Sequence, residues 1–152
     1  MGAAGPAHEG SCHCGAIRLR FRATRPLAEL PLRRCGCSFC RRHGARTVAD
    51  PGGTLDIRAE PGVLARYLFG RRTADFLLCG RCGVYVAAAL SHDGRTVATL
   101  NVNTLEARDT LDPAPPLADY EDETIEARLA RRLARWTPAT VVEGAGRPGP
   151  DA

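Results

Sequence analysis

The residues best suited to chemistry in this 152-residue chain are seven cysteines, which fall into three compact groups. The groups are Cys12 and Cys14, then Cys35, Cys37 and Cys40, and finally Cys79 and Cys82. Spacings of C-x-C and C-x-x-C let one tight turn direct two thiolates at a single ion, and the adjacent glycines permit such turns. An odd number of cysteines argues against a disulfide framework. The spacing therefore predicts metal binding, with zinc as the ion that prefers these ligands.

Two pairs and one triplet divide naturally into a set of four ligands and a set of three. The two outer pairs would close one tetrahedral, structural zinc site, with the ligands Cys12, Cys14, Cys79 and Cys82. The central triplet would bind a second, catalytic zinc ion and leave one coordination position over, with the ligands Cys35, Cys37 and Cys40. Spacing alone leaves another division open, in which Cys12 and Cys14 pair with Cys35 and Cys37.

The residues beside the central triplet decide whether its fourth position is open. His43 follows Cys40 by three residues, which is ligand spacing, so a closed Cys₃His site is the alternative to an open one. Arg41 and Arg42 could pair with substrate carboxylates, because guanidinium groups match carboxylate geometry, or they could be two solvated charges. His13, inside the first C-x-C, is expected to point to solvent.

Most of the chain alternates between apolar and polar residues, as expected for half-buried strands. We predict strands at residues 16–22, 54–58, 63–69, 73–79, 84–91 and 95–103, with a hairpin turn at 92–94. A helical pattern begins at Glu121, where apolar residues recur at helical spacing up to Trp136, which we interpret as a core anchor. The polar face of this helix is assigned to four arginines: Arg128, Arg131, Arg132 and Arg135. Pro138 would end the element.

Composition excludes several classes of protein. All 21 basic residues are arginines and the net charge is +4, but the arginines alternate along strands instead of gathering on one face, so nucleic-acid binding is not favoured. No apolar run is long enough to span a membrane, and the first ten residues lack the features of a signal peptide, so we expect a cytoplasmic protein. A thioredoxin-type redox motif is excluded because no βαβ pattern surrounds Cys79 and Cys82.

Four short motifs resemble the glutathione-dependent formaldehyde-activating enzyme family, which includes centromere protein V. They occupy residues 10–17 (GSCHCGAI), 35–41 (CGCSFCR), 78–83 (LCGRCG) and 101–105 (NVNTL), and the similarity extends over roughly residues 9–136. The central motif of the family usually reads Cys-His-Cys, whereas Gly36 stands in place of the histidine here. This departure weakens the inference, from the resemblance, that this protein acts on the specific substrate of the family.

The resemblance implies a mainly β, Mss4-like fold of packed antiparallel sheets with a short C-terminal helix, stabilised by zinc. It implies the same division into four and three ligands. It also implies a carbon–sulfur lyase that activates a small thiol such as glutathione for reversible adduct formation with formaldehyde or a related aldehyde. The alternative is a non-catalytic zinc-stabilised binding module or thiol carrier. We divide the chain into a disordered tail (1–8), a zinc domain (9–137) and a flexible tail (138–152).

Overall fold

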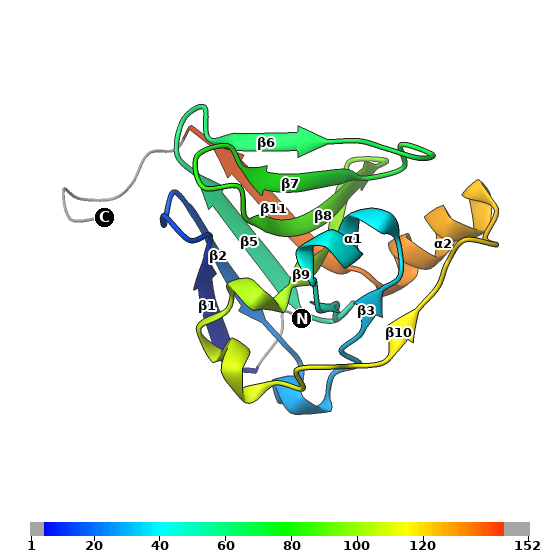
Figure 1. The fold of residues 1–152 in the computed structure, drawn as a ribbon, viewed down its shortest axis with the longest axis horizontal. Coiled ribbons are helices and arrows are strands. Elements are labelled where there is room, and N and C mark those ends of the chain that lie inside the picture. The colour runs from blue at the N-terminus through cyan, green and yellow to red at the C-terminus, as the bar shows by residue number, and fades with distance from the viewer. Residues whose placement is uncertain (1–4, 145–152) are drawn as a thin grey trace.

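The computed structural model describes residues 5–144, which form a nine-stranded sheet with two α-helices at its side (Figure 1). The strands of this sheet are β1 (Ala7–Ser11), β2 (Ile17–Arg22), β4 (Thr47–Val48), β5 (Thr54–Ala59), β6 (Leu64–Tyr67), β7 (Asp75–Cys79), β8 (Tyr85–His92), β9 (Arg95–Asn101) and β11 (Thr137–Glu143). Their order is β1-β2-β5-β11-β9-β8-β7-β6, with β4 paired to β9. The expectation of a mainly β, mostly antiparallel fold with a short late helix is therefore confirmed.

Smaller elements complete the chain. The helices are α1 (Ser38–His43) and α2 (Ile125–Arg135), and a short parallel pair consists of β3 (Arg34–Cys35) and β10 (Leu117–Ala118). Three 3-10 helices lie at Leu27–Glu29, Val102–Thr104 and Glu106–Thr110. None of the helices within residues 5–144 is both long and apolar enough to cross a membrane.

The alternation of side chains along the strands explains where the core lies. Ile17, Leu19 and Phe21 of β2 are almost fully buried, whereas Arg18 and Arg20 between them are exposed. The strand thus buries one face and solvates the other, because successive side chains point to opposite sides of a sheet. The predicted hairpin between β8 and β9 is also present, with Asp93 and Gly94 at positive φ as a tight two-residue turn requires.

The prediction of a flexible tail at 138–152 was wrong for residues 138–143, because they belong to the last strand, β11. It pairs in parallel with β5 through Ala139–Glu143 and antiparallel with β9 through Thr137 and Pro138, so it joins the two halves of the sheet (Figure 1). Pro138 does not prevent this, since a proline near the start of a strand removes only one ladder hydrogen bond. Residues 145–152 of the predicted tail lie outside the described part of the chain.

The predicted tail at 1–8 also needs correction, because β1 begins at Ala7 and pairs along its length with β2. Gly5 and Pro6 are described too, and Gly5 accepts a hydrogen bond from Arg22 through its carbonyl oxygen. Residues 1–4 lie outside the described part. The start of the domain therefore falls before residue 9.

Helix α2 begins later than predicted, at Ile125, because Thr124 caps it: its hydroxyl accepts a hydrogen bond from the Ala127 N–H at 3.0 Å. Trp136 at the C-terminal end is buried against small residues of the sheet, which confirms its assignment to the core. Two assignments along the helix were wrong. Ile125 of the presumed apolar face is 52% exposed, and Arg132 of the presumed polar face turns toward the sheet and is largely buried.

Candidate metal centres and the adjoining cavities

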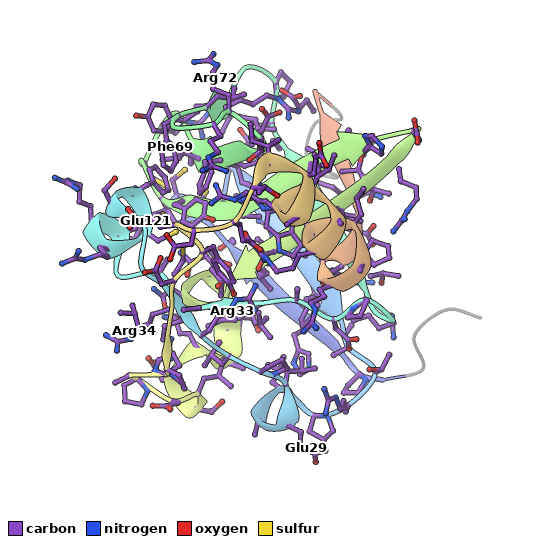
Figure 2. The ribbon with its side chains drawn as sticks, turned by 90° about the vertical axis from the view of Figure 1, so that its right-hand side faces the viewer. Glu29, Arg33, Arg34, Phe69, Arg72 and Glu121 are labelled. Atoms are coloured by element: carbon purple, nitrogen blue, oxygen red, sulfur yellow. The ribbon has the colours of Figure 1, made fainter. Side chains whose placement is uncertain are left out.

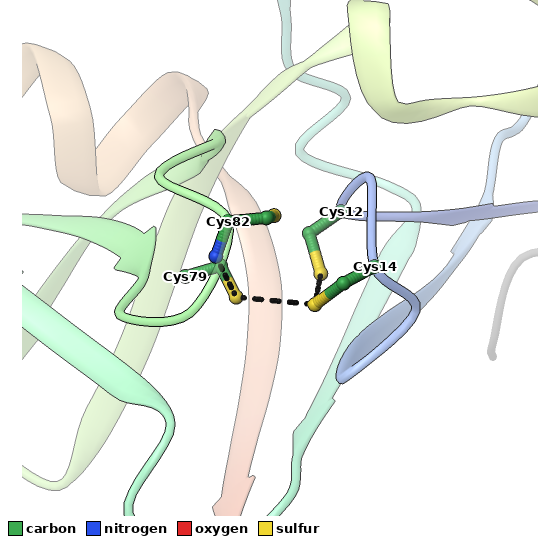
Figure 3. A group of neighbouring side chains, drawn as sticks. All are labelled: Cys12, Cys14, Cys79 and Cys82. Atoms are coloured by element: carbon green, nitrogen blue, oxygen red, sulfur yellow. Dashed lines mark hydrogen bonds between the residues drawn. The ribbon is translucent and has the colours of Figure 1, made fainter.

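The two outer cysteine pairs meet in one compact cluster (Figure 3). Cys12 and Cys14 come from the loop between β1 and β2, Cys79 ends β7, and Cys82 lies in the turn between β7 and β8. Their four sulfur atoms all lie within 4.8 Å of one another, with Cys12 and Cys14 Sγ at 3.7 Å and Cys14 and Cys79 Sγ at 3.6 Å. Tetrahedral zinc with bonds of about 2.3 Å requires sulfur atoms roughly 3.8 Å apart. The four sulfurs therefore fit one zinc ion.

Backbone N–H groups surround these sulfurs and favour their ionised form. Cys79 Sγ accepts hydrogen bonds from the N–H groups of Arg81 and Cys82, both at 3.4 Å, and Cys12 Sγ accepts one from Ile17 at 3.2 Å. Burial raises the pKa of Cys12 to about 12. At Cys82 burial acts in the same direction, but hydrogen bonds from backbone and neighbouring thiols outweigh it and lower the pKa to about 6. Four thiols this close need a cation before all can ionise, which is what a divalent metal supplies.

The central triplet forms a second cluster at the start of α1. Cys35 ends β3, Cys37 is the N-cap of the helix and Cys40 lies in its first turn, and their sulfur atoms also lie within 4.8 Å of one another. Cys37 Sγ accepts a hydrogen bond from the Cys40 N–H at 3.4 Å. Hydrogen bonds from the thiols of Cys35 and Cys40 lower the pKa of Cys37, and the same contacts raise that of Cys40. The alternative grouping, with Cys12 and Cys14 beside Cys35 and Cys37, does not occur in the described chain.

Gly36, which replaces the histidine of the related motif, lies between two of these cysteines and pairs with the strand opposite. Its N–H donates to the Ala118 carbonyl at 2.8 Å, and a Cβ built on it would lie 3.3 Å from the same oxygen. A larger residue would therefore require a small displacement of β10. The glycine gives a close approach between β10 and the strand that carries Cys35.

His43 lies outside this group of sulfur atoms and packs with aromatic residues instead. Its ring centroid is 4.5 Å from that of Phe39 and 5.6 Å from that of Tyr85. In the part of the chain that the structure describes, the central cluster thus has three grouped donors. Arg41 and Arg42 lie on the exposed side of α1, and Arg42 donates to the Ser38 carbonyl at 2.9 Å. His13 is exposed, as expected.

The fourth motif, at residues 101–105, holds the helix that carries Cys40. The Asn101 amide donates to the Tyr85 carbonyl at 2.9 Å, and the Asn103 amide donates to the carbonyl of Gly44, which caps α1, at 3.0 Å. Asn103 also accepts a hydrogen bond from the Arg46 guanidinium at 2.7 Å. These contacts fix the end of α1 against β8 and β9, so the motif positions the central cysteines indirectly.

Two cavities adjoin the cysteine clusters. The larger, about 530 Å³, borders the cluster of four through Cys12 and Cys82 and reaches His43, Tyr85 and Asn103, while none of the three central cysteines is in its wall. The smaller, about 40 Å³, lies on the other side of Tyr85 and has Cys35 and Cys40 in its wall.

Sequence reasoning missed the arginines and tyrosines of the smaller cavity, namely Arg33, Arg131, Arg132, Tyr85 and Tyr120. The sequence did contain an indication that one of them, Arg132, faces the sheet. Arg132 precedes the buried Trp136 by four residues and therefore shares its side of the helix.

The fold and the two clusters define a β-sheet protein with one cysteine set complete for a tetrahedral metal ion and one set of three. A model of the family described as glutathione-dependent formaldehyde-activating enzyme matches residues 7–120, and the chain belongs to this family. The resemblance seen in the sequence is thereby confirmed.

Two individual proteins are similar to parts of the chain. A curated protein of Halomonas elongata, provisionally named glutathione-dependent formaldehyde-activating enzyme, is 53% identical over 56 residues. That match spans 37% of this chain and 31% of the relative, so the chain covers about a third of the length of the relative. The crystal structure of a Rhodobacter sphaeroides protein is similar with a TM-score of 0.57 and 33% identity, over 72% of this chain and 99% of that one.

Proposed function

We propose that this protein is a zinc-dependent carbon–sulfur lyase-type enzyme. It would activate a small thiol, glutathione or a similar molecule, for reversible adduct formation with formaldehyde or a related aldehyde. The observation that carries this proposal is the central cluster, in which three cysteine sulfurs lie together while the nearby histidine packs elsewhere. Membership of the family supports the choice of reaction.

The two clusters would hold two zinc ions with different tasks. The set of four would close a structural site, because closed sites use four protein ligands. The set of three would leave a position at which zinc binds the substrate thiol and stabilises its thiolate near neutral pH. The three cysteines thus hold the ion and provide no nucleophile themselves.

The remaining residues of the site would position the substrate and shield it from water. Tyr85 is buried between the two cavities, and its burial raises the pKa of the phenol well above the usual value, so the hydroxyl stays protonated. The cavity of about 530 Å³ meets the central site only through His43 and Tyr85, but it is within the usual size range for small-molecule sites and would accommodate the body of a peptide thiol. Arg41 and Arg42 are proposed as contacts for its outer carboxylates, since both are exposed on the helix that carries Cys40.

The reduced cysteines fit a reducing compartment, and we propose a cytoplasmic location. All seven are unpaired. Disulfides are rare in the cytosol because glutathione and thioredoxin keep thiols reduced, and that compartment also supplies a small thiol.

The test measures metal, thiol binding and exchange on the purified protein. Elemental analysis should find two zinc ions per chain. Cobalt substituted at the central site should change its visible spectrum when glutathione binds. Exchange NMR should show faster interconversion of formaldehyde and its glutathione adduct with the protein present. Cys37→Ser should remove the last two effects, whereas Ser38→Ala, at an exposed neighbouring position, should leave them unchanged.

The alternative functions give different results. A thiol carrier would show the spectral change without accelerated exchange, and a binding module with a closed central site would show neither. Either result, obtained on a protein that holds two zinc ions, would contradict the proposed lyase activity.

A further inference from the structure

The cavity of about 40 Å³ beside Cys35 and Cys40 is rich in hydrogen-bond donors. Its wall brings together Arg33, which precedes β3, and Arg132 and Trp136 from the end of α2. Figure 2 views the molecule from the side that α2 covers, with Arg33 lower in the view. No aspartate or glutamate lines the cavity within residues 5–144. Three thiolates around a divalent ion would leave one negative charge here, fewer than the two positive charges of Arg33 and Arg132, so a ligand anion would still be needed to balance the cavity.

Arg132 is only partly compensated by its neighbours. Its Nη1 donates to the Thr73 hydroxyl at 2.9 Å and its guanidinium lies 4.7 Å from the Trp136 ring centroid, yet its Nε is buried without a hydrogen-bond partner. Burial, together with the charges of Arg128 and Arg131, lowers its pKa to about 10. Removing a guanidinium from water is costly unless an anion accepts its hydrogen bonds.

Trp136 presents a second unpaired donor in the same wall. The residue is 4% exposed, and its indole N–H has no acceptor in the described structure. A buried donor without an acceptor is costly, so native structures rarely retain one without a ligand or a water molecule to satisfy it. An acceptor with two oxygen atoms, such as a carboxylate, could satisfy both donors.

The other arginine on this face of α2 is already neutralised. Glu123 accepts two hydrogen bonds from the Arg131 guanidinium, at 2.6 and 3.0 Å, and a third from Arg128 at 3.4 Å. By contrast, neither Arg33 nor Arg132 forms an ion pair among the described residues. The charge available for a ligand is thus that of Arg33 and Arg132.

We propose that this cavity is a carboxylate subsite, so that a substrate of the proposed reaction carries a carboxylate close to its reacting atom. The inference rests on the proposed function for the reaction and on Arg132 and Trp136 for the carboxylate. One water needs roughly 10–15 Å³ of such space, so the cavity holds about three non-hydrogen atoms, which suits a carboxylate and excludes a peptide. Since cysteine ligands line the same cavity, the carboxylate must lie within about two bonds of the reacting carbon or sulfur.

Two substrate classes meet this requirement: an aldehyde acid such as glyoxylate, and a short mercapto acid such as mercaptoacetate. With an aldehyde acid, the thiol sulfur forms a bond to the aldehyde carbon and the thiol proton passes to the carbonyl oxygen. The product is a 2-hydroxy acid with sulfur on the same carbon, and the reverse reaction breaks that bond. No oxidant or reductant is needed.

The position of the subsite along the chain is informative as well. The family match ends at residue 120, whereas Arg132 and Trp136 come from the helix that follows. The matched region therefore provides Arg33 and the cysteines of the subsite, whereas the segment beyond it provides Arg132 and Trp136, to which we assign the choice between carboxylate-bearing and neutral substrates.

Binding can be followed directly, because Trp136 is the single tryptophan of the chain. Acetate added to the zinc-loaded protein should change its fluorescence saturably, whereas neutral acetamide should not. Arg132→Gln should weaken acetate binding about tenfold or more, as expected for a lost hydrogen bond to a charged group. Arg135→Gln, at an exposed position of the same helix, is the matched control and should bind like the wild type. Arg132→Lys tests whether the charge alone is sufficient if Arg132→Gln fails to fold.

Rates then identify which partner carries the carboxylate. Glyoxylate with 2-mercaptoethanol and formaldehyde with mercaptoacetate each supply one carboxylate, while formaldehyde with 2-mercaptoethanol supplies none. Arg132→Gln should lower kcat/KM for the first or the second pair relative to the third. Equal effects of Arg132→Gln on all three pairs would overturn the subsite and show that Arg132 merely balances thiolate charge. Zinc loss from this variant, together with no acetate binding by the wild type, would lead to the same conclusion. Acetate binding without any thiol–aldehyde turnover would instead support the subsite and contradict the proposed function.

Discussion

The two cysteine clusters differ in what surrounds them, although both are made of thiols at similar separations. The set of four lies between two turns, and its sulfurs receive hydrogen bonds from the backbone of those turns. The set of three lies at the start of a helix beside Tyr85, an aromatic cluster and the cavity of about 40 Å³. The first cluster connects distant strands and borders the larger cavity through Cys12 and Cys82, whereas the second shares the wall of the small cavity with Arg132 and Trp136. Under the proposed function, the same ligand chemistry would stabilise the fold in one place and support reactivity in the other.

The largest expected effect comes from breaking the cluster of four. Cys79→Ser removes a buried ligand, and a structural zinc ion contributes roughly 10–16 kcal/mol of apparent binding energy, as much as or more than the 5–15 kcal/mol by which typical domains are stable. We expect no cooperative thermal transition in circular dichroism. A cooperative melt close to that of the wild type would show that this cluster does not stabilise the fold.

The equivalent change in the cluster of three should abolish function and leave the fold intact. Cys37→Ser should reduce the zinc content from two ions to one and eliminate glutathione binding. Serine is a good N-cap, so α1 should persist, and a loss of about 1 kcal/mol corresponds to a fall in Tm of about 2–4 °C. Elemental analysis and calorimetry measure both quantities. If Cys37→Ser and Cys79→Ser destabilise the protein equally, the two clusters do not differ in role.

His43→Ala tests whether the fourth coordination position of the central cluster is open. Because the imidazole packs on Phe39, its loss should cost about 1 kcal/mol of stability and leave two zinc ions bound. Thiol binding at the cobalt-substituted site should persist. Loss of the second ion together with a large fall in Tm would identify His43 as a ligand and the central site as closed.

The smallest effect on stability is expected from weakening the ion pairs between Glu123 and the arginines of α2. Glu123→Gln weakens the contacts with Arg131 and Arg128, and we expect a loss of about 1 kcal/mol or less with unchanged zinc content. The hydrogen bond from Arg131 lowers the pKa of Glu123, so the carboxylate is charged at neutral pH and its contribution would be lost only on acidification through that lowered pKa. The difference in Tm between variant and wild type should therefore be constant from about pH 6 to pH 8.

Sequence reasoning located the cysteine clusters because their spacing is a local property that one turn can satisfy. It also located the hairpin at residues 92–94 and the burial of Trp136, for which periodicity is sufficient. It failed at Arg132, because arginine is usually solvated and only the packing of α2 against the sheet turns this one inward. It failed at β11 as well, since Pro138 suggested an end and the partners of the strand lie about 40 and 80 residues earlier.

The position of β11 between β5 and β9 has a consequence for how the chain folds during synthesis. Residues 7–59 and 64–101 are synthesised before β11, so neither β5 nor β9 can form its ladder with β11 at that stage. The four outer cysteines, in contrast, are all present once Cys82 has been made. A metal ion captured at that moment would hold the two half-sheets in register and leave a gap into which the last strand is inserted. Metal supply during translation, and not only in the finished protein, would then govern the yield of folded molecules.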